Sequence, residues 1–188
     1  MVEIRWHGRG GQGAKTAALL FADAALSVGK YVQAFPEYGP ERMGAPVQSF
    51  NRIDDQPILM HCPVKSPSVV VVLDPTLMAS INVTAGLSKE GTLIINTGMS
   101  VAEIKKSVKF DGSIFTVDAS KISEETIGKR IPNTPMLAAL VKVTGILDFD
   151  SMLDDTQKKL AKKFAHRPEV IEGNIQSMKR AAQEVKSA

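Results

Sequence analysis

Short apolar segments alternate with longer segments whose apolar positions recur three or four residues apart, over most of the chain. Residues 69–73, four valines and a leucine, are typical of a strand that is buried on both faces. The segments predicted to be strands are residues 2–6, 31–35, 47–53, 69–73, 92–96 and 114–117. Strands that alternate with helices favour an α/β domain with a mainly parallel sheet flanked by helices.

Helical spacing predicts helices at residues 14–28, 76–85, 100–106, 135–144, 152–164 and 169–185. The first is followed by Gly29, where glycine commonly ends a helix. The last two carry an apolar stripe opposite a charged face. Residues 54–56 are a predicted turn, after which residues 57–61 pair back on residues 47–53 as an edge hairpin. The sequence shows no repeat and no linker, so we expect one domain over residues 1–188.

The junction of the first strand and the first helix is rich in glycine. Gly8, Gly10 and Gly13 satisfy the pattern G-x-G-x-x-G, with Gly11 and Gln12 completing the turn. Glycine adopts positive φ at little cost and lets a phosphate or another backbone approach closely. The helix that follows directs unpaired N–H groups toward the turn. The turn is therefore a candidate phosphate-binding element.

Two common nucleotide sites fit this turn poorly. An NAD site expects an acidic residue about 20 residues further on, at the end of the second strand. That strand ends at Phe35, and the nearest acid is Glu37 in the following loop. A P-loop requires lysine where this chain has Ala14, and Lys15 is turned by about 100° around the helix. Asp74, at the end of a later strand, is expected to cap the helix after it.

Residues 36–46 form a loop that glycine and proline make stiff. A stiff loop loses little entropy when it docks on a ligand or partner, and this one follows a strand near the usual ligand site of α/β sheets. Its candidate contact residues are Glu37, Tyr38, Gly39, Glu41, Arg42 and Gly44. The Arg42 guanidinium can face a phosphate or a partner carboxylate. The alternative is an exposed loop whose charges are solvated.

The charge balance does not indicate a nucleic-acid partner. Lys and Arg number 23 against 20 Asp and Glu, a net charge of only +3. Lysines gather in one predicted helix, which we interpret as a solvated face; they are Lys158, Lys159, Lys162 and Lys163. No apolar run reaches the length of a membrane span, and the chain opens directly into a strand. We expect a cytoplasmic protein with no membrane partner.

The cysteine and histidine content excludes several kinds of site. Cys62 is the one cysteine, so this chain alone forms no disulfide and ligates no cluster. His7, His61 and His166 show no zinc-ligand spacing. We expect Cys62 to be buried as a small hydrophobe, with His61 on the opposite face of an extended segment. His7 is expected to be a satisfied polar group at a strand end.

Four segments together resemble the gamma subunits of 2-oxoacid:ferredoxin oxidoreductases, with the pyruvate:ferredoxin oxidoreductase (pyruvate synthase) type the most similar. They are residues 8–13, residues 37–46, residues 117–119 and residues 132–145. The resemblance extends over nearly the whole chain in similar order and spacing. It implies a Rossmann-like three-layer domain without a nicotinamide, placed beside the active-site subunits near the entrance for coenzyme A.

The resemblance implies an assembly that converts a 2-oxoacid, coenzyme A and oxidised ferredoxin to acyl-CoA, CO₂ and reduced ferredoxin. Thiamine diphosphate and Mg²⁺ would then be held mainly by alpha and beta subunits. Iron–sulfur clusters would be held by beta and by a ferredoxin-like delta subunit. This chain would hold no cofactor and would be inactive alone. The glycine turn and the loop would face coenzyme A or a partner, and that surface can pair with itself as a homodimer in the isolated chain.

One departure bears on the loop. Many members of this family have Glu-x-Arg-Gly there, whereas here Met43 precedes Gly44 and the arginine is Arg42. The resemblance therefore leaves open which loop residue contacts a ligand. Three alternatives also stay open: the gamma subunit of an indolepyruvate- or 2-oxoglutarate-type complex, a free-standing nucleotide-binding α/β protein, and a purely structural module.

Overall fold

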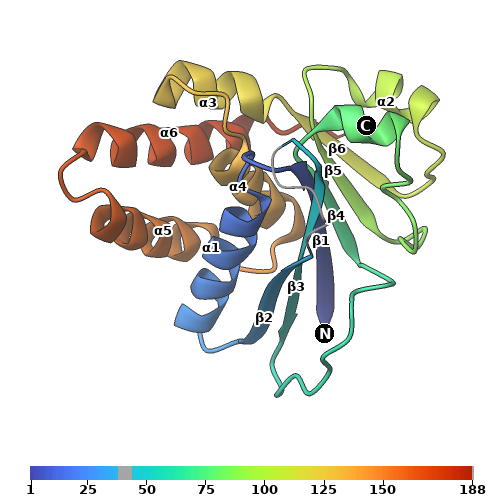
Figure 1. Ribbon diagram of the computed structural model, residues 1–188, viewed down its shortest axis with the longest axis horizontal. Helices are drawn as coiled ribbons and strands as arrows, with labels where there is room; N and C mark the ends of the chain where they lie inside the picture. The colour runs from blue at the N-terminus through green and yellow to red at the C-terminus, as the bar shows by residue number, and fades with distance from the viewer. Residues whose placement is uncertain (38–43, 188) are drawn as a thin grey trace.

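A six-stranded sheet forms the centre of the molecule (Figure 1). The structure is a computed structural model that describes residues 1–37 and 44–187. The strand order is β2 (Tyr31–Glu37), β3 (Pro46–Asp54), β1 (Val2–Arg9), β4 (Val69–Val72), β5 (Thr92–Asn96) and β6 (Ser113–Val117). Strands β1, β4, β5 and β6 are parallel to one another, which confirms the predicted mainly parallel sheet.

The antiparallel part of the sheet lies at the β2 edge. Strand β3 pairs antiparallel with both β1 and β2, so the predicted pairing of β3 with residues 57–61 is wrong. Residues 57–61 form no strand. Pro57 has no N–H to donate to a ladder. The carbonyls of Ile58 and Met60 accept hydrogen bonds from Gln33 Nε2, at 3.3 and 2.8 Å, instead of pairing with a strand.

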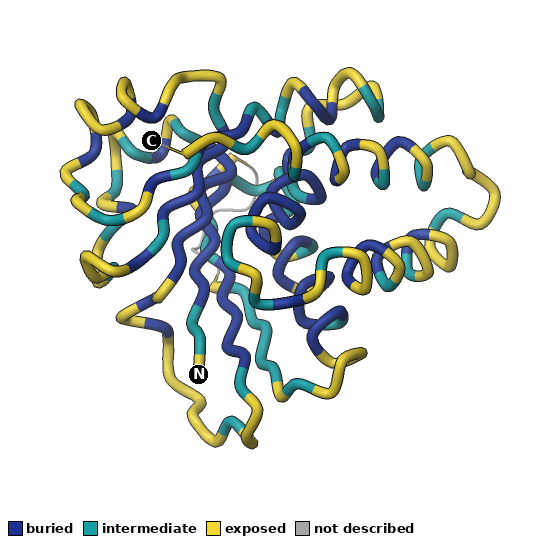
Figure 2. Tube along the Cα trace, turned by 180° about the vertical axis from the view of Figure 1, so that it is seen from behind, coloured by how far each residue is buried: buried dark blue, intermediate teal, exposed yellow. Residues whose placement is uncertain are grey.

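Helices cover the two faces of the sheet unequally, in three layers (Figure 1). One face carries α1 (Ala14–Ser27), α3 (Ala119–Ile127), α4 (Asn133–Thr144), α5 (Phe149–Lys163) and α6 (Pro168–Glu184). The other carries the 3₁₀ helix η1 (Pro75–Ala79) and α2 (Val101–Ser107). Burial is concentrated in the central strands and in α4, as Figure 2 shows. The predicted three-layer arrangement and the two C-terminal helices are confirmed.

Two helix predictions need correction. The helix predicted at residues 76–85 is only the short 3₁₀ helix Pro75–Ala79. Asp74 caps it as predicted, since its side chain accepts a hydrogen bond from the Thr76 N–H. Helix α3 was not predicted, although Asp118 caps its start and Gly128, at φ 73°, ends it. Few of its residues are apolar, so the helical spacing of apolar positions is weak there.

Candidate ligand-binding site

The glycine turn lies between β1 and α1, and two of its glycines have positive φ. Gly11 has φ 98° and Gly13 has φ 84°. A Cβ atom on Gly13 would lie 2.7 Å from Asn133 Nδ2, so Gly13 also allows the start of α4 to approach. At Gly8 a Cβ would make only ordinary contacts, the nearest at 3.5 Å. The turn therefore needs glycine most at its second half, where α1 begins.

Side-chain hydrogen bonds hold this turn in place. Gln12 Oε1 accepts from the Arg9 backbone N–H at 2.8 Å, and Gln12 Nε2 donates to Asp74 Oδ2 at 2.8 Å. Arg9 Nε donates to the same Asp74 oxygen at 3.1 Å. Burial raises the pKa of Asp74, but hydrogen bonds from Thr76 and Gln12 outweigh it and leave that pKa below its ordinary value. Gln12 thus stabilises the turn through both the oxygen and the nitrogen of its side-chain amide. One of the two hydrogens on that nitrogen is donated to Asp74, and the other can be donated to a ligand.

The structure brings the turn together with the end of the candidate loop. The Gly10 N–H donates to the Ala45 carbonyl at 3.0 Å, and Arg9 donates to the Gly44 carbonyl at 3.0 Å. Glu37 is exposed at the end of β2, in register with a residue of β3. Four other predicted site residues lie outside the described residues; they are Tyr38, Gly39, Glu41 and Arg42.

His7 lies in β1, which is longer than predicted, and is buried with 2% of its surface exposed. Its Nε2 accepts from Arg5 Nε at 3.0 Å, while Nδ1 has no partner among the described residues. We expected the hydrogen-bonding groups of His7 to be satisfied. Only one of its two ring nitrogens has a partner among the described residues. Burial and the neighbouring Arg5 charge lower the pKa of His7 to about 4, so the imidazole is neutral at pH 7.

Cys62 is exposed, so its predicted burial is wrong. Although the residue is exposed, the buried Arg52 guanidinium donates to its carbonyl at 2.6 Å and to its Sγ at 3.8 Å. Lys158, Lys162 and Lys163 are exposed as expected.

Residues 1–37 and 44–187 contain no group of three His, Cys, Asp or Glu able to hold a metal ion. Within the same ranges no helix is long and apolar enough to cross a bilayer.

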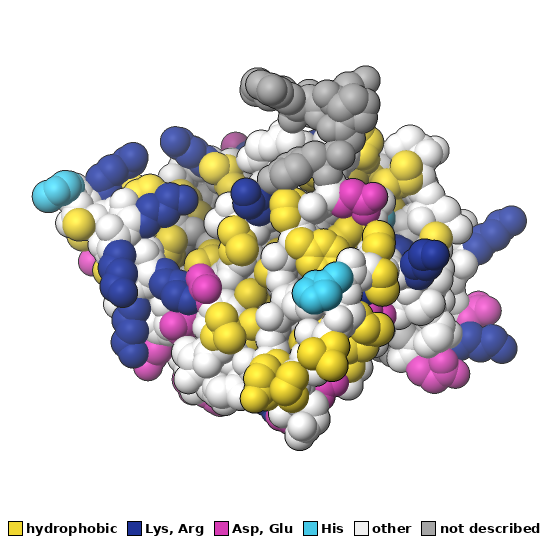
Figure 3. Space-filling view, turned by 60° about the horizontal axis from the view of Figure 1, so that its bottom comes forward, with side chains coloured by type: hydrophobic (Ala, Val, Ile, Leu, Met, Phe, Trp, Pro, Cys, Tyr) yellow, Lys and Arg dark blue, Asp and Glu magenta, His cyan; other side chains and the backbone are white. Residues whose placement is uncertain are grey.

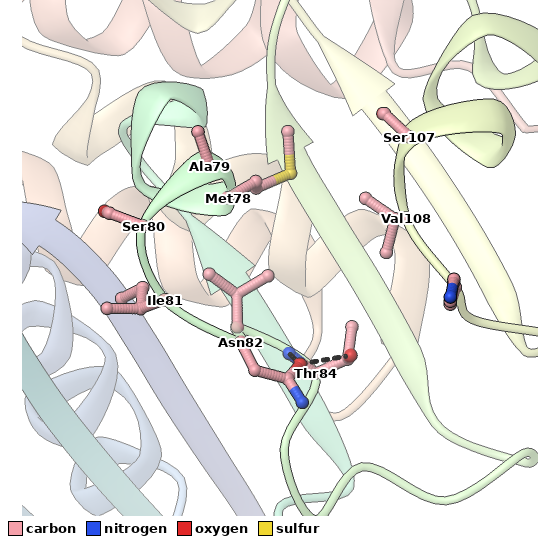
Figure 4. A pocket seen from close by; sticks show the side chains of 10 residues that line it. Met78, Ala79, Ser80, Ile81, Asn82, Thr84, Ser107 and Val108 are labelled. Atoms are coloured by element: carbon pink, nitrogen blue, oxygen red, sulfur yellow. Dashed lines mark hydrogen bonds between the residues drawn. The ribbon is translucent and has the colours of Figure 1, made fainter.

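Cavities lie on both faces of the sheet. One of about 430 Å³ lies between the segment after η1 and the end of α2 (Figure 4). Its hydroxyl groups already have partners: Thr84 Oγ1 donates to Asn82 Oδ1 at 2.9 Å, and the Ser80 and Ser107 hydroxyls donate to backbone carbonyls. A second cavity, of about 300 Å³, lies beside Gly11 and Gly13. Sequence patterns did not indicate this cavity, because its walls come from five helices that lie far apart in the sequence.

The chain is similar to known proteins in sequence and fold. The family described as "Pyruvate ferredoxin/flavodoxin oxidoreductase" matches residues 3–184. "Pyruvate synthase subunit PorC" of Thermotoga maritima is 49% identical over 184 residues, which are 98% of this chain and 94% of that protein. "Pyruvate/ketoisovalerate oxidoreductases common subunit gamma" of Thermococcus kodakarensis is 51% identical over 81% of this chain and 83% of its own length.

The crystal structure of pyruvate oxidoreductase subunit PORC from Thermotoga maritima superposes with a TM-score of 0.87. The two chains are 46% identical, and the match covers all of this chain and 98% of the other. The two chains therefore share one α/β fold. The α/β fold predicted from the strand and helix pattern is therefore confirmed.

Proposed function

Because this chain belongs to the pyruvate ferredoxin/flavodoxin oxidoreductase family, we propose that it is the gamma-type subunit of a pyruvate-type 2-oxoacid:ferredoxin oxidoreductase. The assembly would convert a 2-oxoacid, coenzyme A and oxidised ferredoxin to acyl-CoA, CO₂ and reduced ferredoxin. The observation that carries the proposal is 49% identity to a pyruvate synthase subunit over 98% of this chain. The assembly would work in the cytoplasm.

The side chains of this chain favour a supporting role over bond-breaking chemistry. His7, the histidine nearest the turn, is buried and neutral at pH 7, and the one cysteine cannot ligate an iron–sulfur cluster alone. We assign thiamine diphosphate and Mg²⁺ to the alpha and beta subunits. Iron–sulfur clusters would belong to beta and a ferredoxin-like delta subunit.

The glycine turn and the loop would form one wall of the coenzyme A entrance. The hydrogen bonds from Gly10 and Arg9 to the carbonyls of Ala45 and Gly44 support this, because they hold the end of the loop against the turn. The residues proposed to face coenzyme A or a partner are Gly8, Gly10, Gly11, Gln12, Gly13, Glu37, Tyr38, Gly39, Glu41, Arg42 and Gly44. Arg42 is the one cationic residue of this set, and a guanidinium can bind a phosphate through two N–H groups.

Reconstitution of the complex tests the proposal. Replacing Arg42 by Ala should raise the KM for coenzyme A about tenfold, the cost of one lost charged contact, with little change in the KM for the 2-oxoacid. Lys105→Ala, on α2 at the far face of the sheet, is the control and should change neither constant.

Mass spectrometry of the native complex should find thiamine-binding and ferredoxin-like chains beside this one. Keto-acid oxidation by this chain alone would overturn the subunit role.

A further inference from the structure

The charges of α5 are divided along the helix. Asp150, Asp154 and Asp155 lie in its first half. Residues 156–168, which run through its second half into the start of α6, contain five Lys or Arg and no Asp or Glu. These cations exceed the net charge of +3 of the whole chain, so the rest of the chain is net negative. The two helices meet at one end of the molecule (Figure 1), and Lys and Arg side chains gather at that end in Figure 3. The surface therefore has a basic region at the end of α5.

Three exposed residues of this region form a stripe on one face of α5. We call them the basic stripe; they are Lys158, Ala161 and Lys162. Neither lysine of the stripe makes an ion pair within residues 1–37 and 44–187. Lys159, between them in sequence, is instead paired with Asp155 at 3.0 Å and with Asp23 of α1 at 2.9 Å. The stripe thus presents two cations that the rest of the described chain does not neutralise.

The placement of these lysines costs stability within the helix. Lys158 and Lys162 are four residues apart, and so are Lys159 and Lys163, so each pair of like charges lies on one side of α5. Like charges at this spacing destabilise a helix. The helix dipole favours cations in the last turn, which accounts for Lys162 and Lys163 but not for Lys158. A local arrangement that lowers stability is expected where the side chains serve binding.

The basic stripe is separate from the cavity beside the glycine turn. Lys163 and Arg167 line that cavity, whereas none of the three stripe residues does. The stripe lies on the solvent side of α5, because the side of the helix that is buried carries other residues. These are Met152, Leu153, Thr156 and Leu160. A molecule that binds the stripe therefore approaches α5 from outside and has no need to contact the turn.

The composition of the stripe favours an acidic protein surface over two other anionic partners. Proteins that bind single-stranded nucleic acid stack the bases on aromatic side chains, and the stripe has none. A helix that lies on a membrane presents large apolar side chains beside its cations, whereas the third residue of the stripe is Ala161. Carboxylates about 5–6 Å apart on a partner, as at positions i and i+4 of a helix, would match the two lysines.

We infer that the basic stripe docks this chain on an acidic face of a partner subunit, with carboxylates opposite Lys158 and Lys162. The inference rests on the proposed function, which supplies the partner subunits, and it adds the place and the charge of one contact. Both lysines are exposed, so salt screens their charges beyond about 8 Å at physiological ionic strength. Exposed charges of this kind mainly raise the rate of association. The signature of the stripe is therefore a salt-dependent association rate.

Assembly kinetics test the inference. The full chain is mixed with the other subunits of the complex, and association is followed by light scattering at several NaCl concentrations. The double variant Lys158→Gln, Lys162→Gln should associate about tenfold more slowly than the native chain at low salt, and the difference should vanish near 1 M NaCl, where screening is nearly complete. Lys158→Arg with Lys162→Arg should retain the native rate. Lys179→Gln, which removes an exposed lysine of α6, is the matched control and should also retain it.

Unfolding temperatures separate docking from a structural role. Removing two like charges from one side of α5 should leave the unfolding temperature unchanged or raise it. Slower association at undiminished stability supports the inference, and equal rates for the double variant and the native chain overturn it. The inference also fails if the double variant assembles normally but loses binding to a single-stranded oligonucleotide or to vesicles of phosphatidylcholine and phosphatidylserine, because the stripe would then serve nucleic acid or membrane. A native chain that does not associate with these subunits at all contradicts the proposed function itself.

Discussion

Arg5 and His7 lie on the same buried face of β1, and the charge of each affects the protonation of the other. Arg5 donates to the carbonyls of Val83 and Ala85, at 3.0 and 2.6 Å, and to the His7 ring. Burial lowers the pKa of Arg5, yet the guanidinium remains the cation of the pair because its ordinary pKa is so high. A proton on His7 would place a second charge beside it. His7 is therefore a neutral acceptor, with its proton on the unpaired Nδ1.

This pairing predicts an acid-sensitive fold. The pKa of folded His7 is about 4, below its ordinary value of 6.5, so the unfolded chain takes up the proton first as pH falls. Stability present above pH 6.5 is therefore lost as pH falls toward 4, by up to roughly 3 kcal/mol. Urea unfolding of the native chain and of His7→Gln, at pH 7 and pH 4.5, measures the difference. The variant should lose less stability than the native chain.

An NMR titration of the His7 ring gives a second measure that needs no substitution. Its midpoint should lie well below 6. A His7 midpoint near the ordinary value of 6.5, together with equal acid sensitivity of the native chain and His7→Gln, would contradict the proposed effect of burial and of Arg5.

At the scale of elements, the sequence predicts helices where apolar residues recur at helical spacing and where capping residues can be recognised. Residues 76–85 show why that signal can fail. Leu77, Ile81 and Val83 have near-helical spacing, but the chain leaves the helix after Ala79. The carbonyls of Val83 and Ala85 are held by Arg5, about 80 residues earlier. No local pattern contains that contact, so no local pattern could predict the outcome.

Helix α3 shows the opposite case, in which caps outweigh a weak apolar pattern. The Asp118 side chain accepts from the Lys121 N–H at 3.1 Å and satisfies one of the open donors at the helix start. Asp118→Ala should therefore lower the free energy of unfolding by about 1 kcal/mol. Lys121→Ala, in the same first turn, should change it little, since that side chain is exposed and makes no ion pair within the described residues. Urea unfolding compares the two, and equal losses would argue against the cap.

At the scale of the whole molecule, the parallel half of the sheet was predictable and its antiparallel half was not. A run such as Val69–Val72 specifies a strand buried on both faces. Nothing within residues 47–53 specifies that β3 lies between β1 and β2, because strand order depends on contacts between distant segments. The candidate site, like the sheet, has one part that the sequence predicts and one part that it does not. The glycine spacing marked the turn, but the cavity beside it is assembled from segments up to about 160 residues apart.

An exposed apolar surface remains on the face that carries the segment after β3 (Figure 3). Leu59 is 84% exposed and Met60 is 41% exposed, in the segment that Gln33 of β2 binds through the Met60 carbonyl. Because Leu59 contacts so little of its own chain, Leu59→Ser should leave the unfolding temperature unchanged. If a partner subunit covers this surface, the same change removes the burial of one leucine, about 1.5–3 kcal/mol. Affinity for the partner subunits should then fall at least about tenfold.

Leu26→Ser is the matched control for this surface. Leu26 is also exposed, at 57%, but it lies in α1, which packs on the sheet face opposite to the side chains of Gln33 and Arg52 that bind the segment after β3. Co-purification of the tagged chain with its partner subunits should weaken for Leu59→Ser and not for Leu26→Ser. Equal retention of partners by both variants would place the contact elsewhere. Unfolding temperatures measured on the same samples separate lost affinity from lost structure, because a docking residue affects only the first.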